Sequence, residues 1–496
     1  MIMDITSIDY SILLENSLPV IPGMIDFSGV QTRKFESPLD AILPEHYICG
    51  QNEINYCLLN ARKSHESGQW RNSNRLYRKK ILLNWADSLQ AEADSLALMD
   101  CLQTGRSLKS LQSDSIPKAV EALRWFAELT DKIEDRSVSE GHESRYLTVI
   151  KREPLGVVAV ILPWNDPLVV FIWKVAPALI CGNAVVVKSS EYASYSLVKA
   201  VKLGIKAGIP ENQLQLLTGD ASTGAILVQH ASVDGLSFTG SSSTGQNIAS
   251  QSAIQQLKRI SLECGGKSSF IVSDLSHKIR QAAKCLAKNA FYNQGQICSA
   301  PTRAYIHHGI YDEFIDELIK ESANYQPSHP IQGTSSVGYM INRQAVKSVN
   351  DFIHQAINSG WQYSSIGSVS DLNKCITPTI FFNIPEADPL SVNELFGPVL
   401  IVNKVNHLNE AVARANNSEF GLAAGFWTDD LDETMLISSK LEAGTVHINS
   451  YGEDGMQIPF GGIKNSGLGK EKSIDTLLSY SYTKSICMRL NTSLSS

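Results

Sequence analysis

Hydrophobic and polar positions follow two different patterns along the chain. Residues 51–135 place apolar side chains at helical spacing among Lys, Arg and Glu, and this pattern predicts several amphipathic helices. From residue 156 onward, short runs rich in Val and Ile, such as GVVAVIL and NAVVVKSS, alternate with longer helix-like stretches. Strands that are separated by helices need crossover connections, so we expect a parallel sheet covered by helices on both faces.

The same alternation resumes after residue 267 and continues through FGPVLIVNKV and GTVHINS. It predicts a second α/β domain, with the boundary near residues 264–268. Two further segments, residues 143–155 and 479–490, alternate like strands but lie outside both domains. We expect them to pair with each other and, because exposed strand edges invite pairing, to form subunit contacts.

Composition places the chain among ordinary globular proteins. It has 496 residues, of which 43% are hydrophobic and 19% are charged, and this length suggests three domains or fewer. The 43 Lys and Arg against 50 Asp and Glu give a formal charge of −7, without any long basic block. Proteins that neutralise the phosphates of nucleic acids carry such a block, so we expect no nucleic-acid partner.

Several features bear on the location of the protein. The nine cysteines are widely spaced and include no C-x-x-C pair, which favours reduced thiols over a disulfide framework. The N-terminal residues are acidic where a signal peptide is basic. The apolar stretch 168–187 is interrupted by Lys174 and Pro177, so it predicts a buried helix and a buried strand rather than a membrane span. We therefore expect a cytoplasmic protein without membrane contact.

One cysteine is distinguished by residues elsewhere in the sequence. Cys298 lies in FYNQGQICSA, and a free cysteine taken alone is most often a small buried apolar residue. A thiol that attacks a carbonyl, however, needs a donor for the developing oxyanion and a base that activates water. Asn165 in LPWN and Glu263 in SLECGGK are candidates for these roles. Cys264 is a rival nucleophile, but if residues 260–263 form a strand, its side chain and that of Glu263 point to opposite faces.

Seven motifs in this order resemble those of the NAD(P)-dependent, non-acylating aldehyde dehydrogenase superfamily, from about residue 20 to the C-terminus. They are LPWN (162–165), VVVKSSE (185–191), FTGSSSTG (238–245), LECGGK (262–267), FYNQGQIC (291–298), ELFGPV (394–399) and PFGGIKNSGLG (459–469). The resemblance implies an α/β fold with a Rossmann-type parallel-sheet NAD-binding domain, a second α/β catalytic domain and a small β oligomerisation element. The corresponding residues are 1–136 with 156–264, then 265–477, and finally 137–155 with 478–496. A homodimer or homotetramer is expected.

The resemblance also implies a role for each catalytic candidate. Cys298 is expected to form a thiohemiacetal with the aldehyde, and departure of hydride then leaves a thioester. Glu263 is expected to activate the hydrolytic water, while Asn165 and the backbone N–H of Cys298 form the oxyanion hole. Lys174 and Glu471 match a pair associated with proton exit, although a buried Lys–Glu pair can equally be structural.

A cofactor site is expected where GSSSTG lies between a strand-like and a helix-like run, because a helix N-terminus attracts a pyrophosphate. In the family pattern the pyrophosphate is contacted by Gly240, Ser241 and Gly245, the adenosine ribose by Lys188 and Glu191, the nicotinamide ribose by Glu394 and Phe396, and the cofactor also by Leu162 and Trp164. A carboxylate at Glu191 accepts hydrogen bonds from ribose hydroxyls and repels a 2′-phosphate. The expected cofactor is therefore NAD rather than NADP.

The expected substrate mouth departs from the commonest pattern of the family. Asp166 follows LPWN where many relatives have Phe, and Glu453 and Asp454 stand where several relatives that oxidise neutral aldehydes have apolar residues. Three acids around one funnel favour a cationic substrate, because carboxylates attract an ammonium group that is partly desolvated. The apolar or cation–π wall of the tunnel is expected at Trp173, Tyr292 and Phe460.

Other stretches resemble the bacterial aminoaldehyde branch, which includes the γ-glutamyl-γ-aminobutyraldehyde dehydrogenases of putrescine breakdown. They are ALRWFAELTDK (122–132), FYNQGQIC, YQPSHP (325–330) and KEKS (470–473). Aldehydes derived from polyamines are therefore the expected substrates. Lys118 lies on a helix that is expected to border the mouth, where a cation weakens this argument or instead binds a glutamyl carboxylate.

Other functions remain open beside this one. The alternatives are a dehydrogenase of neutral aliphatic or aromatic aldehydes, a dehydrogenase that acylates coenzyme A, and a scaffold that keeps the fold without turnover. Acylating relatives generally lack the base, and scaffolds often lose the nucleophile or the base, whereas Glu263 and Cys298 are both present. The eleven histidines include no H-E-x-x-H motif and the chain has no Walker loop, so neither a metal site nor phosphoryl transfer is expected.

Overall fold

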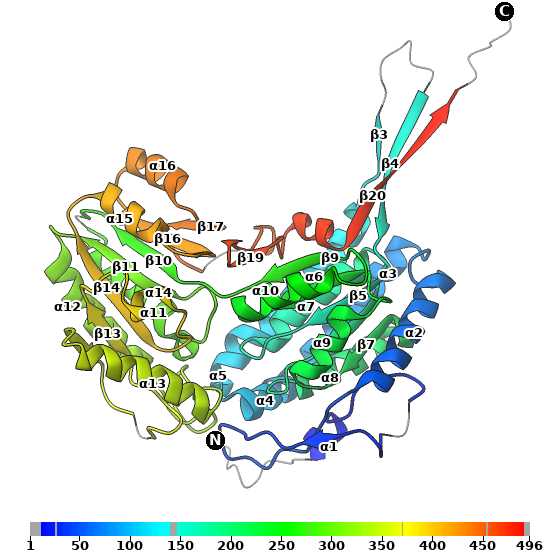
Figure 1. The fold of residues 1–496 in the computed structure, drawn as a ribbon, viewed down its shortest axis with the longest axis horizontal. Coiled ribbons are helices and arrows are strands. Elements are labelled where there is room, and N and C mark those ends of the chain that lie inside the picture. Colours follow the sequence, from blue (N-terminus) through cyan, green and yellow to red (C-terminus); the bar gives the residue numbers. More distant parts are fainter. Residues whose placement is uncertain are drawn as a thin grey trace, which may run out of the picture.

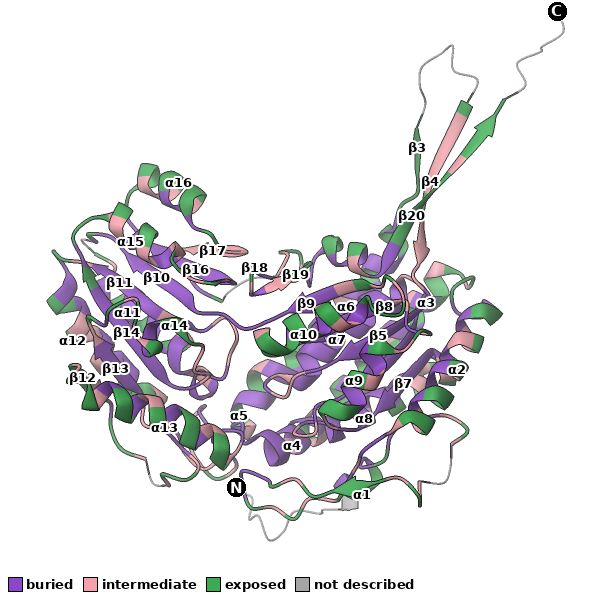
Figure 2. Ribbon diagram, viewed as in Figure 1, coloured by how far each residue is buried: buried purple, intermediate pink, exposed green. Residues whose placement is uncertain are grey.

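The protein is described by a computed structural model that covers residues 11–24, 27–138, 146–275, 277–369, 371–452 and 455–490. Within these residues the chain forms two layered α/β halves side by side, and an arm of antiparallel strands projects away from them (Figure 1). Strands at the centre of each half are buried, and the outward faces of the surrounding helices are exposed (Figure 2). This arrangement is the one that the two alternating stretches predict.

The first half contains a sheet with the strand order β19-β9-β8-β5-β6-β7. Its strands are β5 (Val157–Ile161), β6 (Ala184–Lys188), β7 (Leu214–Leu217), β8 (Gly235–Thr239), β9 (Arg259–Glu263) and β19 (Gly467–Leu468). All neighbouring strands are parallel except β19, which is antiparallel to β9. The chain runs outward from β5 through β6 and β7, and then returns to β8 on the other side of β5. The sheet is therefore doubly wound, with its switch point between β5 and β8.

Two apolar cores cover the two faces of this sheet. The helices are α2 (Gln51–Ser67), α3 (Arg75–Ala91), α4 (Ala93–Thr104), α6 (Ile116–Leu129), α7 (Pro167–Ile180), α8 (Tyr195–Ala207), α9 (Ala221–Gln229) and α10 (Ser242–Ser252). Val158 and Val160 of β5 pack with α3, α4, α6, α7 and α8, whereas Val157 and Ala159 pack with α2, α9 and α10. Successive side chains of a strand point to opposite faces, so a strand that is covered on both faces is apolar throughout. The predicted buried helix and strand within 168–187 are confirmed as α7 and β6.

The second half contains a sheet with the strand order β12-β13-β14-β11-β10-β16-β17. Its strands are β10 (Ser268–Val272), β11 (Pro301–His307), β12 (Tyr363–Ser365), β13 (Thr379–Phe382), β14 (Val399–Val405), β16 (Ala423–Trp427) and β17 (Thr445–Ile448). The surrounding helices are α11 (Ile279–Phe291), α12 (Tyr311–Ser322), α13 (Arg343–Asn358), α14 (Pro389–Val392), α15 (Leu408–Asn416) and α16 (Leu431–Lys440). Only the β12–β13 pair is antiparallel among these described strands. The expected boundary at 264–268 falls between β9 and β10, which belong to different sheets.

The arm pairs two segments that are far apart in the sequence. β20 (Ser481–Arg489) is antiparallel to β4 (Tyr146–Pro154) along its whole length, and β3 (Arg136–Val138) pairs with the other edge of β4. This confirms the expected pairing of residues 143–155 with 479–490. Most side chains of β20 are exposed, so the subunit contacts expected there stay a prediction.

Short elements connect these layers. They are α1 (Ser11–Glu15), β1 (Thr32–Arg33), β2 (His46–Tyr47), α5 (Leu108–Ser110), a π-helical turn (Leu111–Ser115), β15 (Phe420–Gly421), β18 (Ile463–Lys464) and 3₁₀ turns at Thr130–Lys132, Glu211–Gln213, Tyr292–Gly295, Ala323–Tyr325 and Ile474–Ser479. Of the helices that the structure describes, none has both the length and the apolar character that a membrane crossing needs.

Candidate active site

Several of the predicted catalytic and cofactor-binding residues lie at the carboxyl edge of the first sheet. LPWN follows β5, Lys188 ends β6, GSSSTG follows β8, and Glu263 ends β9. The carboxyl ends of parallel strands lie at one edge, and a ligand crevice forms where the strand order reverses. Residues from four different parts of the sequence are thus brought together by the topology of the sheet.

The loop that carries Cys298 is held in an unusual backbone conformation. Residues 293–295, which follow α11, have φ angles of 49°, 54° and 67°. Left-handed angles at residues other than glycine cost free energy and persist only where surrounding contacts impose them. Here the side-chain amide of Gln294 donates to the carbonyl of Gly338 at 2.7 Å and accepts from the N–H of Ile376 at 3.0 Å. The loop carries Cys298, whose exposure as a whole residue is intermediate.

Asn165 lies against this loop. Its Nδ2 donates a hydrogen bond to the carbonyl of Gln296 at 3.1 Å, and an amide nitrogen carries a second hydrogen for another acceptor. Gly266, three residues beyond Glu263, lies close to Cys298, since a Cβ at this position would lie 2.8 Å from the carbonyl oxygen of Cys298. The structure therefore brings together Asn165, Cys298 and the chain that follows Glu263.

Glu263 is a buried carboxylate with an unusual environment. It is 3% exposed, and its Oε1 makes no hydrogen bond to any described residue. Burial raises the pKa of Glu263 well above its ordinary value, and the charge of Glu471 raises it further, whereas Lys174 and Lys470 act in the opposite direction. A buried oxygen without a partner is rare and is typical of functional sites. A carboxylate of raised pKa is also a stronger base once it has lost its proton.

Three carboxylates act on the thiol of Cys298 through their charges. Burial raises its pKa well above the ordinary thiol value, and the negative charges of Glu263, Glu394 and Glu471 raise it further. At neutral pH these groups keep the sulfur protonated. Formation of the nucleophilic thiolate therefore needs a base or a positive charge beside the sulfur.

Lys174 and Glu471 form a buried ion pair, with side chains that are 0% and 4% exposed. Lys174 Nζ also donates to Ser237 Oγ at 3.1 Å and to the carbonyl of Phe238 at 3.2 Å, so each of its three hydrogens has an acceptor. The pair joins α7 to the segment after β19 and lies close enough to Glu263 to shift its pKa. Its contribution to proton exit stays a prediction.

The loop after β8 has the features of a phosphate-binding turn. Ser241 caps α10, and its Oγ accepts a hydrogen bond from the N–H of Thr244 at 3.3 Å. Gly240 donates its N–H to the carbonyl of Glu263 at 3.1 Å, which fixes this turn to β9. A Cβ on Gly245 would lie 2.5 Å from Cys264 Sγ, so glycine lets α10 pack closely on the sheet. Cys264 is correspondingly buried beneath the helix.

The remaining cofactor candidates end or follow β5 and β6, or precede β14. Lys188 Nζ is 3.6 Å from Glu191 Oε2, and burial lowers the pKa of Lys188 although Glu191 opposes the shift. Leu162 is buried, and Trp164 packs edge-on against Phe396 with ring centroids 5.5 Å apart. A dinucleotide needs carboxylates that accept hydrogen bonds from the ribose hydroxyls and a helix N-terminus whose N–H groups donate to the phosphates. The residues present fit NAD.

Glu394 contacts the two glycines of LECGGK. Its Oε1 accepts the N–H of Gly266 at 3.1 Å, and a Cβ on Gly265 would lie only 1.9 Å from its Oε2. Gly265 therefore makes room for this carboxylate, and Gly266 donates a hydrogen bond to it. Burial raises the pKa of Glu394 to about 7, against the effects of the Gly266 N–H and Lys267.

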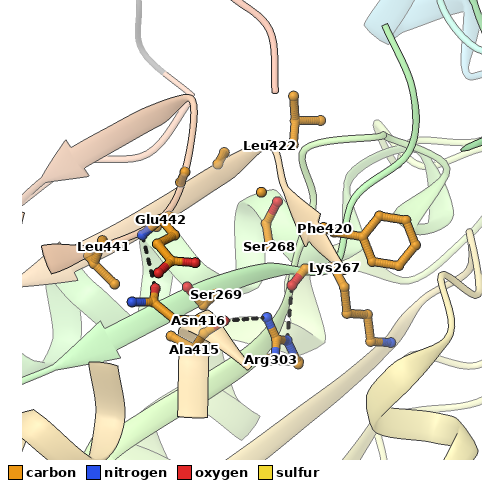
Figure 3. Close-up of a pocket in the computed structure, with 14 residues that line it drawn as sticks. Lys267, Ser268, Ser269, Arg303, Ala415, Asn416, Phe420, Leu422, Leu441 and Glu442 are labelled. Carbon is orange, nitrogen blue, oxygen red and sulfur yellow. Dashed lines mark hydrogen bonds between the residues drawn. The ribbon is translucent and has the colours of Figure 1, made fainter. Parts of the chain in front are cut away.

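A small pocket beyond the two glycines is bridged by Arg303. It lies between β10, β16 and residues 415–421, and none of the described site candidates lines it (Figure 3). Arg303 donates across it to the carbonyl oxygens of Lys267 at 2.9 Å and of Ala415 at 3.0 Å. These bonds anchor the chain directly after the two glycines.

The residues expected at the substrate mouth are linked to one another by ion pairs and hydrogen bonds. Asp166 stands at the N-terminus of α7 without a capping hydrogen bond from its side chain, and its Oδ1 lies 2.8 Å from Arg106 Nη1. The hydroxyl of Tyr292 accepts from Arg106 Nη2 at 2.9 Å and donates to Asp114 Oδ2 at 3.0 Å. Asp114 is also 2.8 Å from Lys118 Nζ. Each of these charges has a partner of opposite sign, so this part of the mouth carries no net charge.

Two of the residues expected in the tunnel wall lie against each other. The rings of Trp173 and Phe460 have centroids 5.7 Å apart, and Lys472 Nζ lies 5.4 Å and 6.0 Å from their respective centroids. A lysine thus already contacts the ring faces that a substrate ammonium would use. Glu453 and Asp454 lie outside the described residues.

Three residues of the site are missing from the sequence-based set. Arg106 links the mouth residues, Gln294 holds the nucleophile loop, and the hydroxyl of Tyr451 donates to the carbonyl of Ser299 at 2.6 Å. Each acts through a contact between segments that are far apart in the sequence. Only Gln294 stands in a motif that could have drawn attention to it.

Comparisons with known proteins point to one family. The sequence profile of the aldehyde dehydrogenase family matches residues 35–486. The NADP/NAD-dependent aldehyde dehydrogenase PuuC of Escherichia coli strain K12 is 38% identical over 440 residues, which cover 88% of each chain. The crystal structure of γ-glutamyl-γ-aminobutyraldehyde dehydrogenase from Burkholderia cenocepacia matches with a TM-score of 0.92 and 34% identity, over 96% of this chain and 97% of that one.

A third similarity concerns the cofactor. The NAD⁺ complex of an aldehyde dehydrogenase from Bacillus cereus matches with a TM-score of 0.92 and 31% identity, over 97% of this chain and 98% of that one. Together with the sheet topology, these similarities confirm the expected fold of two α/β domains and a small antiparallel arm.

Proposed function

Because the chain belongs to the aldehyde dehydrogenase family, and therefore oxidises an aldehyde to an acid with NAD(P), we propose that its substrate is an aminoaldehyde and its preferred cofactor NAD. The contact of Asn165 with the loop of Cys298, beside the chain that follows Glu263, is the observation that carries the mechanism. The substrate class is supported by the 34% identity with the γ-glutamyl-γ-aminobutyraldehyde dehydrogenase of Burkholderia cenocepacia.

In this mechanism Cys298 Sγ attacks the carbonyl carbon of the aldehyde and forms a thiohemiacetal. The amide of Asn165 and the backbone N–H of Cys298 donate to the oxygen, which carries negative charge in the transition state. Bound NAD⁺ would supply the hydride acceptor, and loss of hydride from the carbon and of a proton from its oxygen converts the thiohemiacetal into the thioester. Glu263 then takes a proton from water as the water oxygen attacks the thioester, the carbon–sulfur bond breaks, and the acid leaves. Lys174 and Glu471 provide a route for that proton.

The cofactor preference gives the first prediction. Glu191 lies beside Lys188, where its charge repels a 2′-phosphate, so kcat/KM with NAD is expected to exceed that with NADP. Glu191→Gln removes the repulsion and is expected to raise kcat/KM for NADP about tenfold. Glu211→Gln, an exposed acid before β7, is the matched control and should leave both values unchanged. A wild-type preference for NADP, or a variant without a change in preference, would contradict the role of Glu191.

The paired charges of the mouth bear on the substrate. A substrate with a lone ammonium group gains little from Asp166 while Arg106 is 2.8 Å from its oxygen. A γ-glutamyl head carries both an ammonium and a carboxylate, and this combination suits a mouth that presents Asp114 and Lys118 side by side. Within the aminoaldehydes we therefore favour one whose amine is acylated. The neutral aldehydes remain the alternative, because the same pairing leaves no net charge.

A substrate panel distinguishes these classes and is the second prediction. The kcat/KM for 4-aminobutyraldehyde or its N-γ-glutamyl derivative is expected to exceed that for hexanal and benzaldehyde about tenfold or more, which is the effect of about one charged contact. The reduced cofactor is followed by absorbance, with and without coenzyme A. Faster oxidation of hexanal than of both aminoaldehydes would favour the neutral class, a requirement for coenzyme A the acylating class, and no turnover on any aldehyde the scaffold.

A further inference from the structure

Arg106 makes contacts that the mechanism does not yet use. It follows Gly105 at the C-terminus of α4, and its side chain is almost completely buried. Nη1 donates to the backbone carbonyl of Asn165 at 3.1 Å and pairs with Asp166 Oδ1 at 2.8 Å, while Nη2 donates to the hydroxyl of Tyr292 at 2.9 Å. One guanidinium therefore contacts both the oxyanion-hole loop and the start of the nucleophile loop.

We propose that Arg106 is a positioning residue, which sets the distance between the Asn165 amide and Cys298, and that Asp166 is its counter-ion. The proposal rests on the oxyanion role proposed for Asn165. Asn165 belongs to the first α/β half and Cys298 to the second, so the oxyanion hole exists only when the two halves keep their register. A tie between the two loops maintains that register at the reacting atoms.

The chemistry of the guanidinium suits this task. Its two terminal nitrogens lie in one plane and point in fixed, different directions, so one side chain can hold two acceptors at a defined separation. Burial alone lowers the pKa of Arg106, but the charge of Asp166 and then the contact with Tyr292 outweigh it and raise the pKa. Arg106 therefore stays charged, and its bonds to Asn165 and Tyr292 are charge-assisted.

The same contacts account for the aspartate at position 166. Its Oδ1 also accepts a hydrogen bond from Ser115, which follows Arg106 by nine residues. A buried arginine without a counter-ion is strongly destabilising, and Asp166 supplies the opposite charge at the base of the mouth. The carboxylate then acts on every substrate through Arg106, rather than on cationic substrates through direct contact.

Tyr292→Phe gives the mildest test, because it removes a single hydroxyl and leaves the ion pair of Arg106 with Asp166 intact. Loss of the hydrogen bond between Arg106 and Tyr292 is expected to lower kcat about tenfold for hexanal and 4-aminobutyraldehyde alike. This is a smaller loss than the factor of about 10² that a misplacement of 1 Å can cause. KM for both aldehydes and the melting temperature should stay close to the wild-type values. Lys109→Gln, exposed three residues beyond Arg106, is the matched control.

Variants of Arg106 and Asp166 extend the test. Arg106→Lys keeps the charge but cannot bridge two loops at once, so its kcat is expected to lie between those of wild type and Arg106→Gln. Asp166→Asn is expected to lower kcat for both aldehydes. A rise in KM for 4-aminobutyraldehyde alone, with kcat unchanged, would overturn the proposal and restore Asp166 as a direct receptor of the substrate.

A double-mutant cycle separates positioning from general stabilisation. Asn165→Ala is expected to lower kcat about 10²–10³-fold, and adding Tyr292→Phe should then have almost no further effect, since the amide to be positioned is gone. Additive losses, or a melting temperature that falls while kcat is unchanged, would overturn the role of Arg106. If Asn165→Ala by itself leaves kcat unchanged, the oxyanion assignment fails, whereas an intact Asn165 effect without coupling refutes only the positioning proposal.

Discussion

Replacement of Cys298 by serine is expected to reduce aldehyde oxidation about 10³-fold or more, with the affinity for NAD retained. A serine hydroxyl is a far weaker nucleophile than a thiolate, and burial beside Glu263, Glu394 and Glu471 opposes formation of an anion at this position even for a thiol. The measurement compares the rate of NADH formation with the dissociation constant for NAD from fluorescence titration.

The rival nucleophile supplies the control for this experiment. Cys264 is buried beside Gly245, and burial, followed by the charges of Glu263 and Glu394, raises its pKa to about 12. Cys264→Ser is therefore expected to keep kcat within a few-fold of wild type. Activity that survives in Cys298→Ser, or disappears in Cys264→Ser without a loss of folding, would remove Cys298 from its central role.

The sequence predicted those parts of the site that depend on local order. The β-branched run of β5 and the glycine-rich turn after β8 can be predicted from the local sequence, because strand alternation and turn chemistry involve neighbouring residues. Glu263 and Lys188 end strands of one parallel sheet, so their common location follows from topology once the strands are recognised. The candidate site at this edge could therefore be predicted from the sequence.

Contacts between residues far apart in the sequence could not be predicted from it. Arg106 and Tyr292 are separated by 186 positions, and Tyr451 and Ser299 by 152, so neither pair leaves a pattern in the sequence. Asp166 shows the consequence most clearly. The family resemblance predicted its charge at the substrate mouth but did not predict its partner, and the presence of Arg106 changes what that charge can bind.

Glu263→Gln is expected to stop the reaction after one turnover. Without the base, water attacks the thioester slowly, so kcat should fall about 10²–10⁴-fold. The first half of the reaction does not need Glu263 in this mechanism, so a rapid burst of about one NADH for each active site is expected before the slow phase. Intact mass spectrometry should then detect the acyl group on Cys298. A loss of the burst itself would place Glu263 in the attack step instead of hydrolysis.

Although Glu263→Gln is expected to lower kcat, it is expected to increase the reactivity of the Cys298 thiol toward alkylation. The negative charge of Glu263 raises the pKa of the Cys298 thiol, so its replacement by neutral glutamine lowers that pKa. At a fixed pH near 8 a larger fraction of Cys298 is then thiolate, and alkylation by iodoacetamide in the absence of aldehyde should be faster in the variant than in wild type. The pH profile of alkylation should shift toward lower pH, while Glu211→Gln leaves it in place. Slower alkylation in Glu263→Gln would mean that the carboxylate takes the thiol proton, and a single residue would then serve as base for both attack and hydrolysis.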